Sequence, residues 1–222
     1  KEPLKELEKQ KLVLLKKPEL YARLALEISA KLEKPEVAKA ALAQKGVAQT
    51  ETGRLLTRVV VLDELFAQQA KFASHKIDGS SQKKLAATLK ARIAMVEALE
   101  KTAGRAVDSG DWTAQLLSLD TLAKESERFY SEILSLPMPA GLSADDEQQY
   151  LALLSQQAAP YQIKSQDVKK KVEEFWSNKT AVDTLEKSLL ASTGPLRSMV
   201  VREIKTLATV APETVKPQLD AL

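Results

Sequence analysis

The stretch LAATLKARIAMVEALEKTAGRAV, residues 85–107, decides the fold class of this chain. Its apolar residues recur at steps of three and four, which is the spacing of one face of an α-helix. Ser80 and Ser81 precede the stretch as candidate N-caps, and Gly110 follows it, where a helix end favours a left-handed residue. We therefore predict one long helix with a single apolar face. That face consists of Leu85, Leu89, Ile93, Val96, Leu99, Ala103 and Val107.

Two further long helices are predicted beside this one, over residues 54–75 and 111–136. Both carry apolar residues at helical spacing, and short polar turns around Gly79 and Gly110 join the three helices. Short connections force consecutive helices to lie antiparallel and adjacent. The inward residues expected on the first helix are Leu55, Val59, Leu62, Phe66 and Ala70, and on the second Trp112, Leu116, Leu119, Ala123, Tyr130 and Ile133.

The rest of the chain is predicted to form shorter helices. Pro18 and Pro35 fit the first positions of two N-terminal helices, the first over residues 19–31. Ser143 and Asp146 have the spacing of a capping box, and Pro160 is expected to separate two helices beyond it. No segment alternates with a period of two, so we expect an all-α chain. The C-terminal helices are expected over residues 150–158, 162–177, 180–191 and 195–210.

Composition and charge fit a helical protein that does not bind nucleic acid. Among 222 residues there are only seven glycines and 5% aromatics, whereas strong helix formers are abundant. The formal net charge is +3, from 33 basic and 30 acidic side chains. The basic residues form no stripe with interleaved aromatics, as a nucleic-acid surface requires. We therefore expect no nucleic-acid partner.

The chain contains no cysteine, which excludes disulfides, thiolate metal sites and cysteine nucleophiles. It also has no run approaching the roughly 18 apolar residues of a membrane-spanning helix, so we expect no transmembrane segment in this stretch of protein. Because the sequence begins at Lys1 rather than at a methionine, we expect it to be a fragment whose targeting signal lies outside it.

One stretch carries family information, namely LPMPAGLSADDEQQYLALLSQQAAPY, residues 136–161. In it a proline-rich turn leads into an acidic helix that contains a tyrosine, and Gly110-Asp111-Trp112 opens a tryptophan-bearing hairpin upstream. Over about residues 83–176 the chain resembles the C-terminal region of large tetratricopeptide-repeat (TPR) proteins from gliding and predatory delta-proteobacteria, such as the adventurous-gliding motility proteins. The resemblance implies a helical repeat scaffold of the bacterial cell envelope, on the periplasmic side, that acts through protein contacts.

The expected fold is therefore a set of antiparallel helical hairpins in a TPR-like solenoid, with long central helices. We expect three consecutive segments that together form one continuous solenoid. They are residues 1–52, as short degenerate TPR-like helical pairs, residues 53–136, as long antiparallel hairpins, and residues 137–222, as a proline turn followed by C-terminal helices.

The sequence offers little for catalysis. His75 is the only histidine, so neither a catalytic triad nor a histidine metal site is supported, and its place near a predicted helix end favours a capping role. The acidic residues stand in adjacent groups, such as residues 145–147, and neighbours on a helix point about 100° apart, so these groups do not converge. No phosphate-binding glycine loop, zinc motif or nucleophile elbow is present. We therefore expect no enzyme activity, no metal and no cofactor.

Aromatic side chains are the best candidates for partner contacts. Phe175 and Trp176 are adjacent on a predicted helix and so cannot both face one core. Exposed aromatics commonly anchor protein interfaces. The candidate partner-binding residues are therefore Tyr150, Tyr161 and Trp176.

Pro137, Pro139 and Gly141 are predicted to form a structural turn rather than a binding loop. Each proline fixes its own φ and disfavours a helical conformation in the residue before it, so the chain must leave the preceding helix here.

These observations predict a non-enzymatic scaffold for protein–protein interaction, part of a larger TPR-type envelope protein whose partners are other proteins. The alternative is a self-contained helical bundle that binds a small apolar ligand or a lipid in its core. An internal cavity lined by leucine and valine favours the bundle, whereas a solid core with a concave exterior favours the scaffold.

Overall fold

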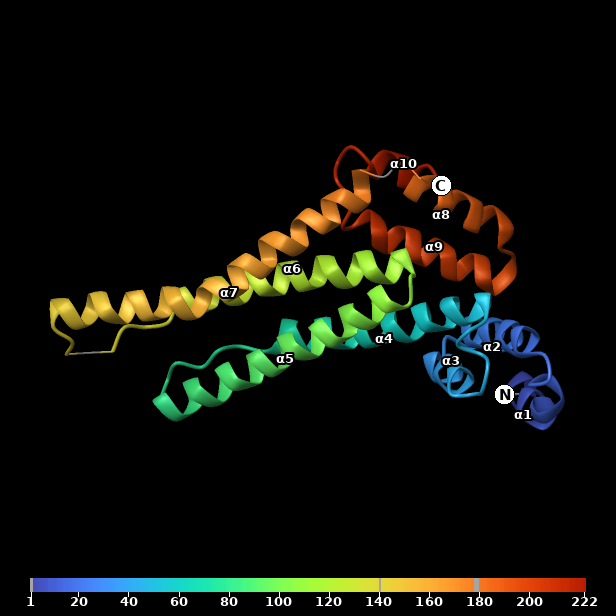
Figure 1. The fold of residues 1–222 in the computed structure, drawn as a ribbon, viewed down its shortest axis with the longest axis horizontal. Helices are drawn as coiled ribbons and strands as arrows, with labels where there is room; N and C mark the ends of the chain where they lie inside the picture. The colour runs from blue at the N-terminus through green and yellow to red at the C-terminus, as the bar shows by residue number, and fades with distance from the viewer. Residues whose placement is uncertain (1, 140, 178–179) are drawn as a thin grey trace. The chain divides into compact units, whose positions relative to one another are not determined.

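The computed structural model describes residues 2–139, 141–177 and 180–222. These residues form ten α-helices and no β-strand, which confirms the prediction of an all-α fold (Figure 1). The helices are α1 (Glu2–Leu14), α2 (Pro18–Leu32), α3 (Pro35–Leu42), α4 (Glu51–Ser74), α5 (Gln82–Asp108), α6 (Trp112–Leu134), α7 (Ala144–Ser177), α8 (Thr180–Ala191), α9 (Gly194–Ala208) and α10 (Lys216–Asp220).

Local sequence signals set several helix ends. Helices α2 and α3 both begin at a proline, whose missing N–H is not needed in the first turn. At the start of α7, the Asp146 N–H donates to Ser143 Oγ over 3.2 Å and the Ser143 N–H donates to Asp146 Oδ2 over 3.4 Å, which completes the predicted capping box. Gly110 follows α5 with a φ of +67°, the left-handed conformation expected after a helix end.

Pro160 does not separate two helices, and that prediction was wrong. Pro160 lies inside α7, which is continuous over 34 residues. The proline ring leaves the carbonyl of Gln156 without its helical N–H partner, a loss that often breaks a helix. Packing on both sides holds α7 together, because Ala158 and Ser165 are fully buried and Ser165 Oγ donates to Glu127 on α6 over 3.0 Å.

The helices form two compact units, each assembled from separated stretches of sequence. Unit 1 takes the described residues of 1–64, 104–117 and 175–222, and unit 2 takes residues 65–103 and 118–174. Helices α4, α5, α6 and α7 each contribute residues to both units. The division into three consecutive segments of one solenoid stays a prediction.

Unit 1 has its core around α2, which contacts α1, α3 and α9. Tyr21 is 2% exposed at this core, and the small side chains of Ala22, Ala25 and Ala38 are fully buried, so the helices approach closely. Helix α9 also contacts α8 and α10, and α8 and α9 form a hairpin near the C-terminal end of the chain (Figure 1).

Parts of α4, α5, α6 and α7 form most of unit 2. In this unit α4 packs antiparallel to α5, and α6 packs antiparallel to α7. Gln68 Nε2 on α4 donates to Thr102 Oγ1 on α5 over 2.9 Å, whereas Phe72, one turn later on α4, lies under the earlier residue Arg92. This opposite order is the predicted hairpin arrangement. The same order holds for α6 and α7, where the pairs are Glu127 with Ser165 and Phe129 with Tyr161.

The predicted inward face of α5 is correct at Val96, Leu99 and Ala103 and wrong at two other positions. Val96 and Leu99 are buried as expected, but Ile93 is 38% exposed and Val107 is 49% exposed. The fully buried side chain in the turn before Val96 is Arg92 instead. A helix with apolar residues on more than one face leaves the choice of the inward face to its neighbours.

The inward face of α4 is likewise displaced from the predicted one. Leu62 is buried as expected, whereas Phe66 is 43% exposed and Leu65 is fully buried in its place. Helix α6 follows its prediction closely, since four of its six predicted core residues are buried and the other two are half-buried. The four are Leu116, Leu119, Ala123 and Ile133, and the two are Trp112 and Tyr130.

Candidate binding groove

Unit 1 contains an open, largely apolar groove between α1 and α2. Residues of α1 and α2 line it, together with Pro195 in the first turn of α9. Its volume is about 520 Å³, which is within the range of roughly 300–1,000 Å³ that ligand sites occupy. The lining residues are Pro3, Glu6, Leu7, Gln10 and Leu14 of α1 and Leu24, Glu27, Ile28 and Lys31 of α2.

The floor of the groove is an extension of the core of unit 1. Leu7 is 5% exposed and belongs to the buried cluster, while Leu14, Leu24 and Ile28 are half-buried and pack against that cluster. The two helices therefore share their apolar residues between the core and the groove. A floor held by the core is pre-formed, so a ligand need not order it on binding.

The rim of the groove is charged. Glu6 and Glu27 stand on opposite walls, and Lys31 lies one turn after Glu27 on the same wall. None of these three charges forms an ion pair with another described residue, and Glu6 only accepts a hydrogen bond from Gln10 Nε2 on its own helix. By contrast, Glu19 on α2 is paired with Arg23 at 2.9 Å.

The three aromatic residues predicted to bind a partner are distributed over both units. Tyr150 and Tyr161 lie in unit 2 and are half-buried, whereas Trp176 lies in unit 1 and is only 8% exposed. Trp176 therefore does not present an exposed ring, because α7 turns that side inward, and Phe175 is the more exposed member of the adjacent pair. None of the three lines the groove.

The contacts of the two tyrosines favour structural roles in unit 2. The Tyr150 hydroxyl donates to the carbonyl oxygen of Pro137 over 3.1 Å and so ties α7 to the preceding turn. The Tyr161 ring meets Phe129 edge-on with centroids 4.5 Å apart, and burial raises the pKa of its hydroxyl. Both tyrosine side chains therefore already make contacts with other residues of the same chain.

The turn that contains Pro137, Pro139 and Gly141 packs against another loop of unit 2. Gly141 has a φ of +84°, a conformation that favours glycine, as expected for a reversal of direction. The ring of Pro137 lies against Gly79 in the loop between α4 and α5, where an added Cβ would come within 3.2 Å of Pro137 Cγ. Pro139 is exposed, and Ala140 lies outside the described residues. The turn therefore packs against a second loop.

Unit 2 contains a buried charged cluster that was not predicted from the amino-acid pattern. Arg92 has a fully buried side chain, donates to both carboxylate oxygens of Glu132 over 2.6–3.0 Å, and lies 3.5 Å from Glu125. Its guanidinium also lies over the ring of Phe72 at 5.3 Å from the centroid. Position 92 has the helical spacing of the inward face, but a hydropathy pattern reserves that face for apolar residues, so Arg92 was not among the predicted core positions.

His75 does not cap α4 with its side chain, which corrects the prediction. Neither of its ring nitrogens makes a well-formed hydrogen bond within the described part of the chain, although both are buried. Burial, and then the positive charge of Arg92, lowers the pKa of His75, while Glu132 acts in the opposite direction. The ring lies near the charges of Arg92, Glu132 and Arg128, and no carboxylate of the described residues is hydrogen-bonded to it.

A second buried charged cluster stabilises unit 1. Arg58 on α4 donates to Asp111 Oδ2 and to Glu203 Oε2 on α9, both over 2.8 Å, and all three side chains are at most 10% exposed. Burial raises the pKa of Glu203, against the effect of Arg58. Asp111 also caps α6, because its Oδ1 accepts from the Ala114 N–H over 2.9 Å. The cluster links α4, the start of α6 and α9 through ion pairs and hydrogen bonds.

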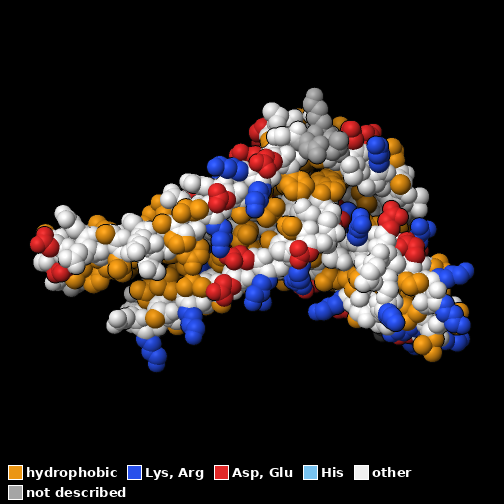
Figure 2. Space-filling view, in the orientation of Figure 1, with side chains coloured by type: hydrophobic (Ala, Val, Ile, Leu, Met, Phe, Trp, Pro, Cys, Tyr) orange, Lys and Arg blue, Asp and Glu red, His pale blue; other side chains and the backbone are white. Residues whose placement is uncertain are grey.

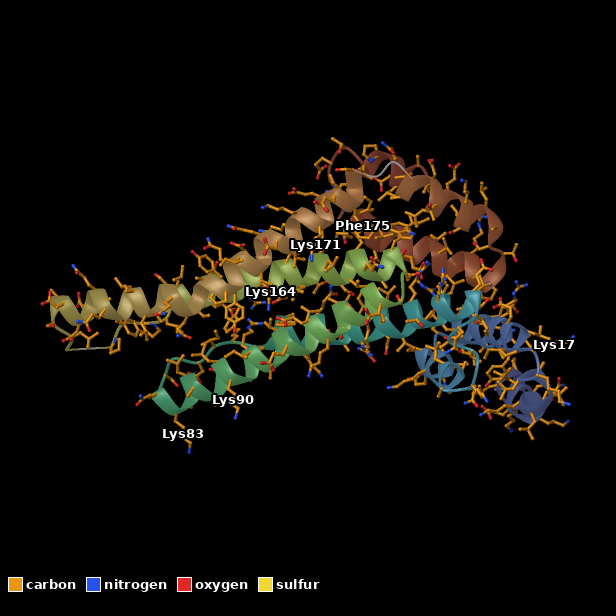
Figure 3. All side chains as sticks on the ribbon, viewed as in Figure 1. Lys17, Lys83, Lys90, Lys164, Lys171 and Phe175 are labelled. Carbon is orange, nitrogen blue, oxygen red and sulfur yellow. The ribbon has the colours of Figure 1, made fainter. Side chains whose placement is uncertain are left out.

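Charges on the helix surfaces are mixed in sign. Lys164 on α7 pairs with Glu100 on α5, and Lys169 pairs with Glu127 over 3.2 Å, whereas Lys83 and Lys90 project outward from α5 (Figure 3). Both basic and acidic side chains occur on the face seen in Figure 2. Among the described residues, none of the helices is both long enough and apolar enough to cross a membrane.

Comparison of the chain with protein-family models, with curated proteins and with solved structures found no match. The groove and the two charged clusters are therefore interpreted from their own geometry.

Proposed function

We propose that this chain is a non-enzymatic scaffold that binds a protein partner in the groove between α1 and α2, as part of a larger TPR-type protein of the bacterial cell envelope. The groove carries the proposal. It has a pre-formed apolar floor, formed by residues such as Leu24 and Ile28, and a rim of charges without partners in the described chain. Interfaces commonly combine an apolar centre with a polar rim.

The interior of the protein supports a binding role over catalysis. In the two buried clusters, Arg58 and Arg92 form ion pairs with carboxylates from other parts of the chain. Catalytic groups need a free side chain facing a cleft, and the clusters present no such group in the described residues. The resemblance to envelope TPR proteins supports the same role.

The alternative function is binding of a small apolar ligand or a lipid. The same groove favours it in one respect, because its volume of about 520 Å³ suits a small molecule. The charged residues on both walls argue against it, since a lipid tail leaves them unpaired.

Site-specific photo-crosslinking tests the proposal and separates it from the alternative. A photoreactive amino acid replaces Gln10, which is exposed and lines the groove. The matched control carries it at Leu12, which is 84% exposed on the same helix but outside the groove lining. Each protein is irradiated in an extract of the source cell's envelope, and the products are identified by mass spectrometry.

We expect one protein to be captured from Gln10 and not from Leu12. The purified partner must then bind the purified chain, with an affinity that falls when Leu24 is replaced by Asp. Capture of a lipid or a small molecule at Gln10 would establish the alternative function. Equal products from both positions would show that the groove has no role in binding.

A further inference from the structure

We propose that the groove between α1 and α2 binds a single amphipathic helix of the partner, with Lys or Arg residues beside its apolar face. This inference rests on the proposed function and names the chemistry of the partner.

The shape of the groove fits a helix better than other peptide conformations. Its α1 wall extends from Pro3 to Leu14, a rise of about 16 Å, so it matches a helix of about three turns. Addition of a β-strand requires a sheet edge, and the described residues contain no strand. A polyproline segment requires aromatic walls, and the groove lining contains no aromatic residue.

The spacing of the lining residues also suits helix packing. On α2, the residues Leu24, Ile28 and Lys31 follow at steps of four and three, so that one ridge of side chains borders the groove. A third helix can place its own ridge between this one and the matching ridge of α1. Its apolar residues, at steps of three and four, then cover the leucine and isoleucine floor.

The charged residues that line the groove determine which kind of helix it favours. Glu6 stands on one wall and Glu27 on the other, and neither has a cationic partner among the described residues. A partner helix with a basic residue on each side of its apolar face reaches both carboxylates. Lys31 lies one turn beyond Glu27. Its positive charge repels a basic residue of the partner at that end of the groove and attracts an acidic one. The charges thus favour a basic partner and give it a preferred direction.

Selection from a displayed peptide library tests this inference with the full chain as the target. Each peptide has about four helical turns, with leucine fixed at the apolar positions and the flanking positions free to be Lys, Gln or Glu. The test variant is Glu6→Gln with Glu27→Gln, both at exposed positions. The matched control is Glu36→Gln with Glu51→Gln, which makes the same charge change at exposed positions outside the groove.

We expect the wild type and the control to enrich Lys-flanked peptides over Glu-flanked ones. The selected peptides should bind roughly 2- to 30-fold more tightly than their Glu-flanked versions, the range expected for two exposed ion pairs. The Glu6→Gln, Glu27→Gln variant should lose this preference. A third target, with Leu24→Asp, should retain few peptides of either kind.

The outcomes separate the two proposals. Equal recovery of Lys-, Gln- and Glu-flanked peptides that still depends on Leu24 refutes the basic partner and leaves the scaffold in place. Recovery that is unchanged by Leu24→Asp, or no recovery from the wild type, refutes both the helix partner and the groove as a protein-binding site.

Discussion

Replacing Arg58 by methionine should destabilise unit 1 more than any surface substitution of the same kind. The change removes the one positive charge between Asp111 and Glu203, whose side chains are only 5% and 6% exposed. Loss of one member of a buried ion pair typically costs about 3–5 kcal/mol, because the remaining charge stays buried without a partner. Methionine retains much of the length of the side chain, so the cost comes mainly from the charge.

Urea unfolding followed by circular dichroism measures this cost. With a slope of about 2 kcal/mol/M, a loss of about 3–5 kcal/mol lowers the urea midpoint by roughly 2 M. The matched control is Arg23→Met, because Arg23 pairs with Glu19 at 2.9 Å but has a side chain 66% exposed. Exposed pairs contribute about 0.2–1 kcal/mol, so the control midpoint should fall by at most about 0.5 M.

A double variant separates charge burial from loss of packing. Arg58→Met combined with Glu203→Leu removes the carboxylate on α9 and leaves Asp111 to cap α6. Because an apolar replacement of a buried pair is often neutral, the double variant should be more stable than Arg58→Met alone. The reasoning fails if Arg58→Met unfolds at the same urea concentration as Arg23→Met, or if the double variant is the less stable of the two.

Three further predictions concern α7 and the charged cluster of unit 2. Pro160→Ala should raise the urea midpoint, since proline inside a helix costs up to about 3 kcal/mol relative to alanine; a lower midpoint would mean that the proline is required by its neighbours. Ser143→Ala should lower the stability of the same helix by about 1 kcal/mol through loss of the N-cap, and Ser143→Asp, which restores a capping oxygen, should recover it. The folded-state pKa of His75 lies below 6.5, so stability should fall as the pH drops from about 6.5 toward that lower value, because the unfolded chain binds the proton more readily. His75→Phe removes the titrating ring at a position where neither ring nitrogen makes a well-formed hydrogen bond, so its urea midpoint should fall less than that of the wild type between pH 7.5 and 5.5; equal falls would exclude His75 as the cause.

The helices were predictable from the sequence because their causes are local. Apolar spacing defined the centre of α5, and the prolines and the Ser143 capping box marked helix starts. Pro160 misled the prediction because the local rule considers one lost hydrogen bond and cannot include the packing of α7 against α6. Local signals thus indicated which residues are helical more reliably than where one helix ends.

The candidate groove and the buried charges depend on contacts that periodicity does not describe. Leu24 and Ile28 pack against the core of unit 1 and also line a groove that exists only once α1 lies beside α2. Arg92 was missed because a hydropathy pattern treats every arginine as outward, whereas the two glutamates on α6 that compensate it lie 33 and 40 residues later in the sequence. Trp176 was a candidate because it and Phe175 cannot both face one core, and which of the two is buried depends on which side of α7 packs inward.

The division of unit 1 into separated stretches has a consequence for synthesis on the ribosome. Arg58 and Glu203 lie 145 residues apart, so at about 5–20 residues per second the carboxylate follows the guanidinium by roughly 7–30 s. Unit 2, which occupies residues 65–103 and 118–174, is fully translated before α8 and α9 emerge. During that interval α1, α2 and α3 lack the side chains of α9 that pack against their core, including Leu196 and Met199. Until α9 is translated, the nascent chain therefore exposes the part of the apolar core of α1, α2 and α3 that Leu196 and Met199 cover in the folded protein.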